Sequence, residues 1–355
     1  MFRKAGIVLV NYKDYVNRFL AECRDSLRKQ SYPDFNVYIV DNASSEASRE
    51  YIKHNYPEAI IIPREDGNYA AANNAGMKKA KEDGCHYFVI ANMDTCFDPK
   101  WLGELVKAMD NLEDAGFVQS KMLLYPQTEE ERHHPEINSL GNIMNYLGFG
   151  FTGAYRELDR KIEGYPEIVG YASGCSFITT GTVIDHIGYY DEEYWMYHDD
   201  IEMGWRVKTA GYKIYLAPES VVYHKYEFGR SVRMLYYMER NRYLAILHYY
   251  TCPTILLLLP AIVVMDLGMV FYSIPGGWVK TKFKANLYFL RPFTWTKIAR
   301  KRKKVNNLRA VKEKDIIKHF EGRVLFQEIE NPVLKYIANP LFSIYWKIIK
   351  KLVHW

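Results

Sequence analysis

The sequence predicts an α/β fold with a mainly parallel sheet, followed by a helical region that associates with a membrane. Short apolar runs alternate with helical stretches over the first 125 of its 355 residues, which is typical of a parallel sheet covered by helices on both faces. An apolar run at 255–274 precedes a strongly basic segment, and this combination is typical of a membrane surface.

The expected strands of the first part are unbroken apolar runs, the pattern of strands that are buried on both faces. They lie at 7–10, 37–40, 59–62 and 87–90. Between the first two, apolar residues recur at helical spacing up to a turn at 31–33. Because ligands of parallel sheets bind beyond the carboxyl ends of the strands, we expect the functional site where polar residues follow these runs.

The middle of the chain is less regular. Residues 126–170 show no clear periodicity, so we expect a long excursion on the binding side of the sheet. Order resumes with an apolar stretch at 174–178, a helix near 200–210 that Gly211 ends, and a strand near 213–216.

Charge is segregated along the chain. Residues 1–266 hold 28 Lys and Arg against 37 Asp and Glu, whereas residues 267–312 hold 12 basic residues and no acidic one. A nucleic-acid-binding protein carries its positive charge on the binding domain, but here the larger, amino-terminal part is acidic, so we expect no nucleic-acid partner. The confined basic segment instead favours an anionic membrane surface as a partner.

The carboxy-terminal third predicts contact with a membrane. Twenty apolar residues at 255–274 suffice to cross a bilayer once, but Pro260 interrupts them and Asp266 would cost about 2.5–3.5 kcal/mol at the centre of a spanning helix. The basic segment 280–304 and an amphipathic segment at 333–355 favour an interfacial location. Pro340 is expected to break or kink the second segment. The alternative explanation of the apolar run is a buried core helix or a contact in a homo-oligomer.

The cysteines and the amino-terminal residues indicate the cellular compartment in which the protein is found. Five cysteines, an odd number without a Cys-x-x-Cys pair, favour a reducing compartment. The apolar run near the amino terminus is too short for a signal peptide, and we expect it to form the first strand.

Two polar clusters follow the second and third strands. Asp41 could accept a hydrogen bond from the imide N–H of uracil or thymine, although a helix cap would explain it equally. The stretch 67–76 combines small residues with the amides of Asn68, Asn73 and Asn74, which permits close approach of a ligand to a helix start. Tight helix packing would produce the same pattern.

Two further residues suggest a metal site. Asn92 and Asp94 close the fourth strand, where a carboxylate can hold Mg²⁺ or Mn²⁺ together with a diphosphate; the alternative is a cap of the next helix. His224 ends a later strand and becomes a candidate metal ligand when it is paired with Asp94, although a lone histidine is more often structural.

The densest acidic cluster is Asp199-Asp200-Ile201-Glu202 at an expected helix start, where the helix dipole stabilises negative charge. Two adjacent carboxylates in a cleft also raise each other's pKa, which suits one of them as a general base. Trp195, just before them, could form an apolar wall or stack on a sugar ring.

In this order the motifs resemble the family 2 inverting glycosyltransferases with a GT-A fold, above all the rhamnosyltransferase-like branch. The matching stretches are 7–12, 38–45, 68–76, 91–95, 174–177, 187–211 and 222–224. The resemblance implies a catalytic domain at 1–245 and a helical membrane-associated region at 246–355. The Gln-x-x-Arg-Trp motif of processive synthases is absent, so we expect transfer of one or a few sugars.

The resemblance also implies a role for each matching residue. Asp200 corresponds to the catalytic base, with Asp199 beside it, and Asp94 to the metal-binding acid, with His224 as a further ligand of Mg²⁺ or Mn²⁺. Asn92 stands where many relatives carry an aspartate. The donor-binding residues would be Asn11, Asp41, Asn68, Asn73, Asn74, Asn92 and Asp94, and the acceptor-binding residues Trp195, Gly174 and Cys175.

The implied reaction moves a sugar from a UDP- or dTDP-sugar to a hydroxyl group of a lipid-linked saccharide or cell-surface glycan. Since nucleotide sugars are cytosolic, the catalytic domain and the basic segment both belong on the cytoplasmic face, which a single span between them would prevent. We therefore expect 255–274 to form a re-entrant or interfacial hairpin.

Two other functions are the alternatives to this one. A sugar nucleotidyltransferase needs a Gly-rich amino-terminal signature with a basic residue, which residues 10–13 do not supply. A catalytically inactive membrane-attached scaffold would have no need of Asp94, Asp199, Asp200 and His224 together.

Overall fold

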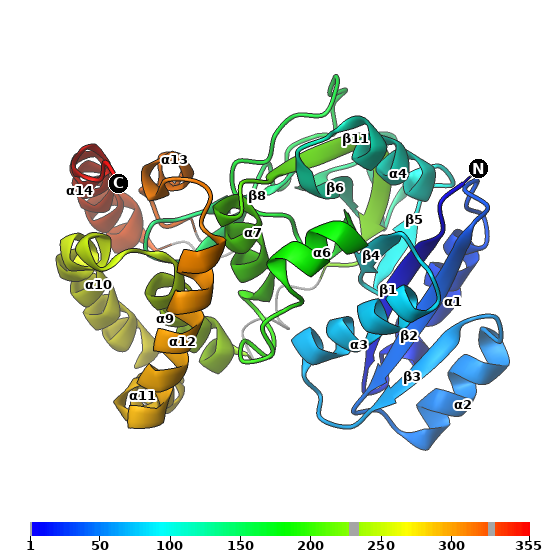
Figure 1. The fold of residues 1–355 in the computed structure, drawn as a ribbon, viewed down its shortest axis with the longest axis horizontal. Coiled ribbons are helices and arrows are strands. Elements are labelled where there is room, and N and C mark those ends of the chain that lie inside the picture. Colours follow the sequence, from blue (N-terminus) through cyan, green and yellow to red (C-terminus); the bar gives the residue numbers. More distant parts are fainter. Residues whose placement is uncertain (1, 227–233, 326–330) are drawn as a thin grey trace. The chain divides into compact units, whose positions relative to one another are not determined.

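The computed structural model describes residues 2–226, 234–325 and 331–355 (Figure 1). The chain divides into two compact units. Unit 1 comprises Met1–Asn142, Thr152–Met196 and Tyr212–Tyr226, and unit 2 comprises Ile143–Phe151, Tyr197–Gly211 and Glu227–Trp355. The helix that carries Asp199 and Asp200 belongs to unit 2, and the domain boundary expected at residue 245 stays a prediction.

Unit 1 is built on a sheet whose strand order is β3-β2-β1-β4-β10-β6-β11-β5, with β7 paired to β6. Its strands are β1 Ala5–Tyr12, β2 Phe35–Asn42, β3 Ile60–Arg64, β4 Tyr87–Ala91, β5 Thr95–Phe97, β6 Ala115–Leu124, β7 Ile137–Ser139, β10 Ser176–Thr180 and β11 Lys213–His224. β1 to β4 pair in parallel, as do β6 and β11, whereas β10, β5 and β7 are antiparallel to their neighbours. The mainly parallel α/β sheet expected from the apolar runs is confirmed.

Helices cover both faces of this sheet. Alternate residues of a strand point to opposite sides, so strands that are apolar throughout give the sheet two apolar faces to bury. Ile7 and Leu9 of β1 join a core with buried residues of α1 and α4, while Val8 faces α3. A Cβ at Gly76 of α3 would lie 2.3 Å from Val8 Cγ1, so tight helix packing does account for this small residue. The helices are α1 Tyr15–Leu27, α2 Glu46–Asn55, α3 Tyr69–Glu82, α4 Trp101–Asn111, α5 Glu129–His133 and α6 Gly181–Ile187.

Unit 2 is mainly helical. Its helices are α7 Asp199–Thr209, α9 Leu235–Tyr249, α10 Cys252–Ser273, α11 Val279–Leu287, α12 Pro292–Leu308, α13 Glu313–Ile317 and α14 Asn339–Leu352, with short turns η1 Tyr288–Leu290 and η2 Leu334–Ala338. Its core is aromatic: the Trp205 ring lies 5.2 Å from that of Tyr249, and the Tyr146 ring stacks on Trp346 at 4.7 Å. Among the described residues, α10 alone is long and apolar enough to cross a membrane, by criteria that the core helix of a soluble protein also meets.

Three local expectations need adjustment. The strand near 213–216 and the apolar run at 221–223 form one strand, β11, with a register shift between Ala217 and Val221. The region 126–170 contains short elements, namely α5, β7, β8 Asn142–Met144 and β9 Gly150–Thr152. Pro340 lies in the first turn of α14 and does not kink it, because the missing amide hydrogen of proline costs nothing there.

Candidate active site

Asp41 lies near the end of β2, where its carboxylate is fully buried and accepts several hydrogen bonds. Parallel pairing places it opposite Asn11 of β1, whose Nδ2 donates to Asp41 Oδ1 at 2.8 Å. The Ser44 hydroxyl donates to the same oxygen, and Arg49 Nε donates to Oδ2 at 3.0 Å. A carboxylate offers about four lone-pair sites, so these three donors fix its orientation and leave room for about one more N–H.

Two buried amide atoms, one at the end of β2 and one in α3, have no hydrogen-bond partner among the residues that the structure describes. Asn42 Oδ1 accepts from the Gly67 N–H at 3.1 Å, but its Nδ2 is unpaired. Asn73 Nδ2 donates to Tyr69 O at 3.1 Å, but its Oδ1 is unpaired. Buried polar atoms are nearly always satisfied, so both are candidate contacts for a ligand.

Asn68 and Asn74, by contrast, are used by the protein. Asn68 caps α3 by accepting from the Ala71 N–H at 3.1 Å, and it donates to Glu192 O at 2.9 Å. Asn74 donates to Tyr190 O and Glu192 Oε1 at 2.9 and 3.0 Å and accepts from the Tyr190 N–H at 2.9 Å. Both side chains therefore hold the loop that leads to Trp195.

Asp94 and His224 come together at the other side of the same sheet. The turn from β4 to β5 carries Asn92 and Asp94, and the antiparallel β5–β11 pairing sets Thr95 opposite His224. As a result His224 Nε2 lies 3.5 Å from Asp94 Oδ1. Nδ1 of the same ring lies 2.9 Å from Asn138 Oδ1. Because an amide oxygen only accepts, Nδ1 carries a hydrogen and Nε2 is the atom directed to Asp94.

The surroundings of His224 favour its charged form. Burial lowers the pKa of His224, but Cys175 and Asp94 outweigh burial and raise it to about 10. A carboxylate oxygen and an imidazole nitrogen suit a divalent cation such as Mn²⁺. Among the described residues no cluster of three or more His, Cys, Asp or Glu side chains could hold a metal, so this pair would need phosphate or water oxygens to complete a coordination sphere.

The remaining residues expected near the donor and acceptor also lie in unit 1. The Tyr69 hydroxyl donates to Asn92 Oδ1 at 3.2 Å, and the Asn92 N–H donates to Cys175 O at 3.0 Å. A Cβ at Gly174 would lie 3.7 Å from the same Tyr69 hydroxyl. Tyr69 therefore links the expected donor side to the Gly174-Cys175 segment.

Asp199 and Asp200 begin α7 in unit 2. Asp199 is buried, and its burial, the adjacent Asp200 and Glu202 raise its pKa to about 8. Asp200 is half-buried and accepts from the Ile201 N–H at 2.8 Å. Glu202 points inward instead, where Arg206 Nη2 at 2.5 Å, the Tyr249 hydroxyl and Lys301 Nζ at 3.0 Å contact its carboxylate. The acidic cluster thus splits into a pair at the helix start and one structural carboxylate.

Backbone strain gathers around the expected site residues. Lys13 and Ala43, just after β1 and β2, have φ of 55° and 54°, and Trp195, Tyr197 and His198 have φ of 65°, 59° and 59°. Such conformations cost roughly 1–3 kcal/mol each for non-glycine residues and often accompany functional sites.

Sequence reasoning missed three residues of these networks: Arg49, Tyr69 and Asn138. Arg49 and Tyr69 lie within helices where nothing in the spacing marks them. Asn138 lies in the segment expected to be irregular and meets His224 only through strand pairing.

The model of a known family matches residues 7–180 and is described as Glycosyl transferase family 2. The matched span runs from β1 to β10 and contains Asp41 with its partners and Asp94, whereas His224 lies beyond it in β11. Residues 7–180 form a glycosyl transferase family 2 domain.

Curated relatives of the family 2 domain are distant. The chain is 24% identical over 238 residues to an N-acetylglucosaminyl-diphospho-decaprenol L-rhamnosyltransferase of Mycobacterium tuberculosis, which covers 62% of this chain and 75% of the relative. It is 25% identical over 228 residues to the O-antigen biosynthesis protein RfbC of Myxococcus xanthus, covering 61% of this chain and 17% of the relative. The expected resemblance to rhamnosyltransferase-like proteins is confirmed.

A solved structure shares the fold of the family 2 domain. It is GalNAc-T7 with UDP, GalNAc and Mn²⁺, with a TM-score of 0.52 and 16% identity. The match covers 69% of this chain and 47% of that one, so this chain spans less than half of it. The GT-A-like α/β fold expected from the sequence is confirmed.

Proposed function

We propose that the protein is an inverting glycosyltransferase that moves a sugar from a uridine or thymidine diphosphate sugar to a hydroxyl group of a lipid-linked saccharide. The observation that supports this most is that Asp41 and Asp94 lie in the family 2 domain and that Asp94 pairs with His224, which ends β11 of the same sheet. The acceptor class rests on the mycobacterial relative, whose name describes transfer to a diphospho-decaprenol saccharide.

Each residue then has a chemical task. The free acceptor site of Asp41 would bind the imide N–H of the pyrimidine ring, and the unpaired Asn42 Nδ2 and Asn73 Oδ1 would contact the donor. Asp94 and His224 would hold a divalent cation, which, when bound, neutralises charge that develops on the leaving diphosphate. The Trp195 ring, which lies near Gly67, would flank the acceptor sugar, and Gly174 and Cys175 would also contact the acceptor.

Asp200 would act as the general base. It is more exposed than Asp199, and burial makes Asp199 retain its proton near neutral pH. Beside a neutral Asp199, Asp200 can take the proton of the acceptor hydroxyl as that oxygen attacks the anomeric carbon from the face opposite the departing diphosphate. Because the donors are cytosolic, we place the enzyme on the cytoplasmic face of a membrane.

The proposal is tested by measuring nucleoside diphosphate release from a panel of UDP- and dTDP-sugars with Mn²⁺ and a polyprenyl-diphosphate saccharide acceptor. Asp200→Asn should lower turnover by about a hundredfold or more. Donor binding, followed by thermal shift, should be nearly unchanged. Asp185→Asn, which alters an exposed carboxylate of α6, is the control and should retain full turnover. Retained turnover in Asp200→Asn would refute its assignment as the base, and an inactive wild-type chain with every donor would favour a scaffold.

A further inference from the structure

Helix α10 is apolar on all sides, but only one side is covered. Its residues Thr254, Leu258, Ala261, Met265 and Met269 recur at helical spacing and are buried within unit 2. The opposite side exposes large apolar side chains to 47–70% of their surface: Leu256, Leu259, Val263, Val264, Leu267 and Phe271. A helix that is apolar all round normally has an apolar environment all round, but the described part of the chain supplies only half of this environment.

Helix α14 carries a second exposed apolar stripe and packs against α10. Trp346 and Ile349 are buried, and the Tyr345 hydroxyl donates to Leu257 O of α10. The exposed stripe consists of Leu341, Ile344, Ile348 and Leu352, each 50–64% exposed. Twenty of the 24 exposed large apolar side chains in the described part of the chain lie between residues 256 and 352. Single exposed leucines are normal, but such a concentration marks a binding surface.

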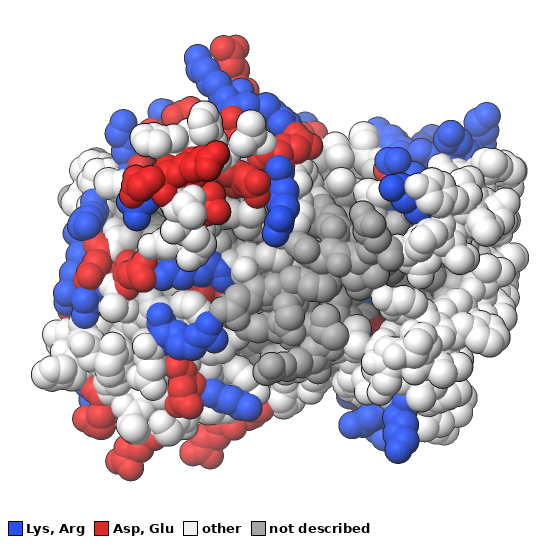
Figure 2. Space-filling view, turned by 180° about the vertical axis from the view of Figure 1, so that it is seen from behind, with Lys and Arg blue, Asp and Glu red and all other residues white. Residues whose placement is uncertain are grey.

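The exposed charges of the described residues after 233 are almost all positive. The exposed basic residues there are Lys280, Lys284, Arg291, Arg300, Lys303, Lys304, Lys312, Lys318, Arg323, Lys335, Lys347 and Lys351. Within residues 234–325 and 331–355, Asp315 is the only exposed carboxylate. In Figure 2 the right-hand part, formed by unit 2, is mostly white with blue groups at its upper and lower edges. Lys347 and Lys351 lie beside Ile344, Ile348 and Leu352, so their stems can cover apolar surface while their ammonium groups reach headgroups.

We propose that the exposed faces of α10 and α14 form a surface that docks on a bilayer containing anionic phospholipids, with α10 lying in the interface and not crossing it. The exposed rings of Trp295 and Tyr336 suit the headgroup region, where amphipathic rings gather, and the apolar ring of Phe271 suits the hydrocarbon below it. The one-sided positive charge selects anionic lipid over a protein partner, whose interface core is usually depleted of lysine.

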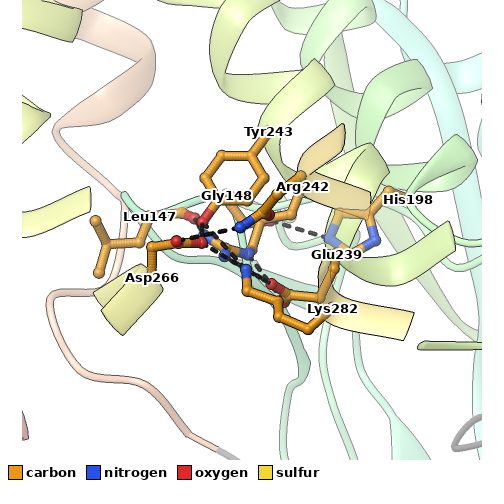
Figure 3. A network of polar contacts seen from close by, with 9 residues as sticks. Leu147, Gly148, His198, Glu239, Arg242, Tyr243, Asp266 and Lys282 are labelled. Atoms are coloured by element: carbon orange, nitrogen blue, oxygen red, sulfur yellow. Dashed lines mark hydrogen bonds and ion pairs between the residues drawn. The ribbon is translucent and has the colours of Figure 1, made fainter. Parts of the chain in front are cut away.

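A buried ionic network fixes α10 to its neighbours and excludes a simple span (Figure 3). Lys282 of α11 is fully buried, and its Nζ lies 2.5 Å from Asp266 Oδ1 of α10 and 2.6 Å from Glu239 Oε2 of α9. Arg242 Nη2 lies 3.1 Å from the same Glu239 oxygen. Since α9 precedes α10 and α11 follows it, a spanning α10 would put Glu239 and Lys282 on opposite sides of the membrane. Their direct contact requires both ends of α10 to stay on one side.

Vesicle binding by the full chain tests the docking surface. The protein should co-sediment with phosphatidylcholine vesicles that contain phosphatidylglycerol, and more weakly with phosphatidylcholine alone. Val264→Glu/Phe271→Glu should weaken this binding by about tenfold or more, because two exposed apolar contacts become charged. Leu158→Glu is the matched control: it places a glutamate at a 61% exposed leucine of unit 1 and should bind like the wild type.

Three outcomes of this experiment would overturn the docking surface: no vesicle binding, equal binding by the double variant, or an equal loss in Leu158→Glu. A chain that is dimeric by light scattering, becomes monomeric in Val264→Glu/Phe271→Glu and ignores vesicles would identify a second copy as the occupant. None of these readouts depends on sugar transfer, so the docking surface and the proposed reaction can fail separately.

Thiol labelling tests the interfacial position of α10. Cys252 is exposed at the start of the helix, and Ile274→Cys in a Cys252→Ser background introduces a thiol where Ile274 is 59% exposed, just past its end. With protein bound from outside, a membrane-impermeant maleimide should label both thiols without detergent. A thiol at one end that reacts only after the vesicles are dissolved would show that α10 crosses the bilayer.

Discussion

Hydrogen-bond use separates the polar side chains of the candidate site into two kinds. The amides of Asn68 and Asn74 form hydrogen bonds with the loop at 190–192. Asn42 and Asn73, in contrast, each have one buried amide atom without a partner among the described residues. All four look alike in the sequence, because an amide next to a strand or helix end can serve either purpose. Only the register of the neighbouring elements decides which amides remain available to a ligand.

Replacing Asn73 and Asn74 should therefore give opposite results. Asn74→Ala removes three hydrogen bonds and should lower the free energy of unfolding by about 1–3 kcal/mol, measured in urea. Asn73→Ala loses one bond within its own helix and should change stability by less, but it should weaken nucleotide-sugar binding in a thermal-shift titration. Equal effects of the two changes on donor binding would contradict this distinction.

The pKa of Asp199 makes stability depend on pH. Its pKa of about 8 in the folded protein exceeds the ordinary value of 3.8, so folding retains its proton. This contribution to stability is complete below pH 3.8 and is lost as the pH rises to about 8. Asp199→Asn should remove the loss, and its melting temperature should exceed that of the wild type by more at pH 8 than at about pH 5. Glu163→Gln, at an 88% exposed side chain, should show no such trend.

His224 can be tested through the metal requirement of the reaction. His224→Gln should raise the Mn²⁺ concentration needed for half-maximal transfer, by about 10–100-fold if Nε2 is a ligand. Lys225→Gln changes the adjacent residue, whose Nζ pairs with Glu22, and should leave the Mn²⁺ requirement unchanged. An unaltered requirement in His224→Gln would assign the histidine a structural role beside Asp94.

At the scale of elements, strand pairing and helix orientation supply what the sequence leaves open. The apolar runs predict β1 to β4 well, because strands buried on both faces need no alternation. The approach of His224 to Asp94 depends on the β5–β11 pairing between segments far apart in the chain, which no local pattern encodes. Glu202 shares its helix start with Asp199 and Asp200, yet the helical turn directs it inward.

The inward Glu202 should matter for stability. Its carboxylate is contacted by Arg206, Lys301 and Tyr249 and is fully buried. Glu202→Gln would leave two cations without their counter-charge, so we expect a loss of about 3–5 kcal/mol in the free energy of unfolding. Glu129→Gln makes the same change at an 81% exposed side chain that also pairs with an arginine, and it should change stability by less than about 1 kcal/mol.

At the scale of the whole molecule, the segregated charge of the sequence remains the most informative global feature. It predicts a basic region after residue 266, and the described part of unit 2 indeed exposes a single carboxylate. Sequence pattern could not show that α10 is covered on one side only, because a helix that is apolar all round has no periodicity to read. Sequence pattern also could not show the division into two units. Helix α7 belongs to unit 2 because it contacts α9, α12 and α13, which all follow the strands of the sheet in the chain.

The network of Glu239, Lys282 and Asp266 has an evolutionary consequence. Loss of any one member removes a counter-charge from a buried ionic network, so single substitutions should be selected against while paired replacements by apolar residues of similar size are tolerated. In an alignment of homologues these positions should therefore covary, with Lys282 absent wherever Asp266 and Glu239 are both neutral. At the exposed positions of α10, homologues should exchange Leu, Ile, Val and Phe for one another, because a fluid hydrocarbon layer accommodates apolar side chains of any shape.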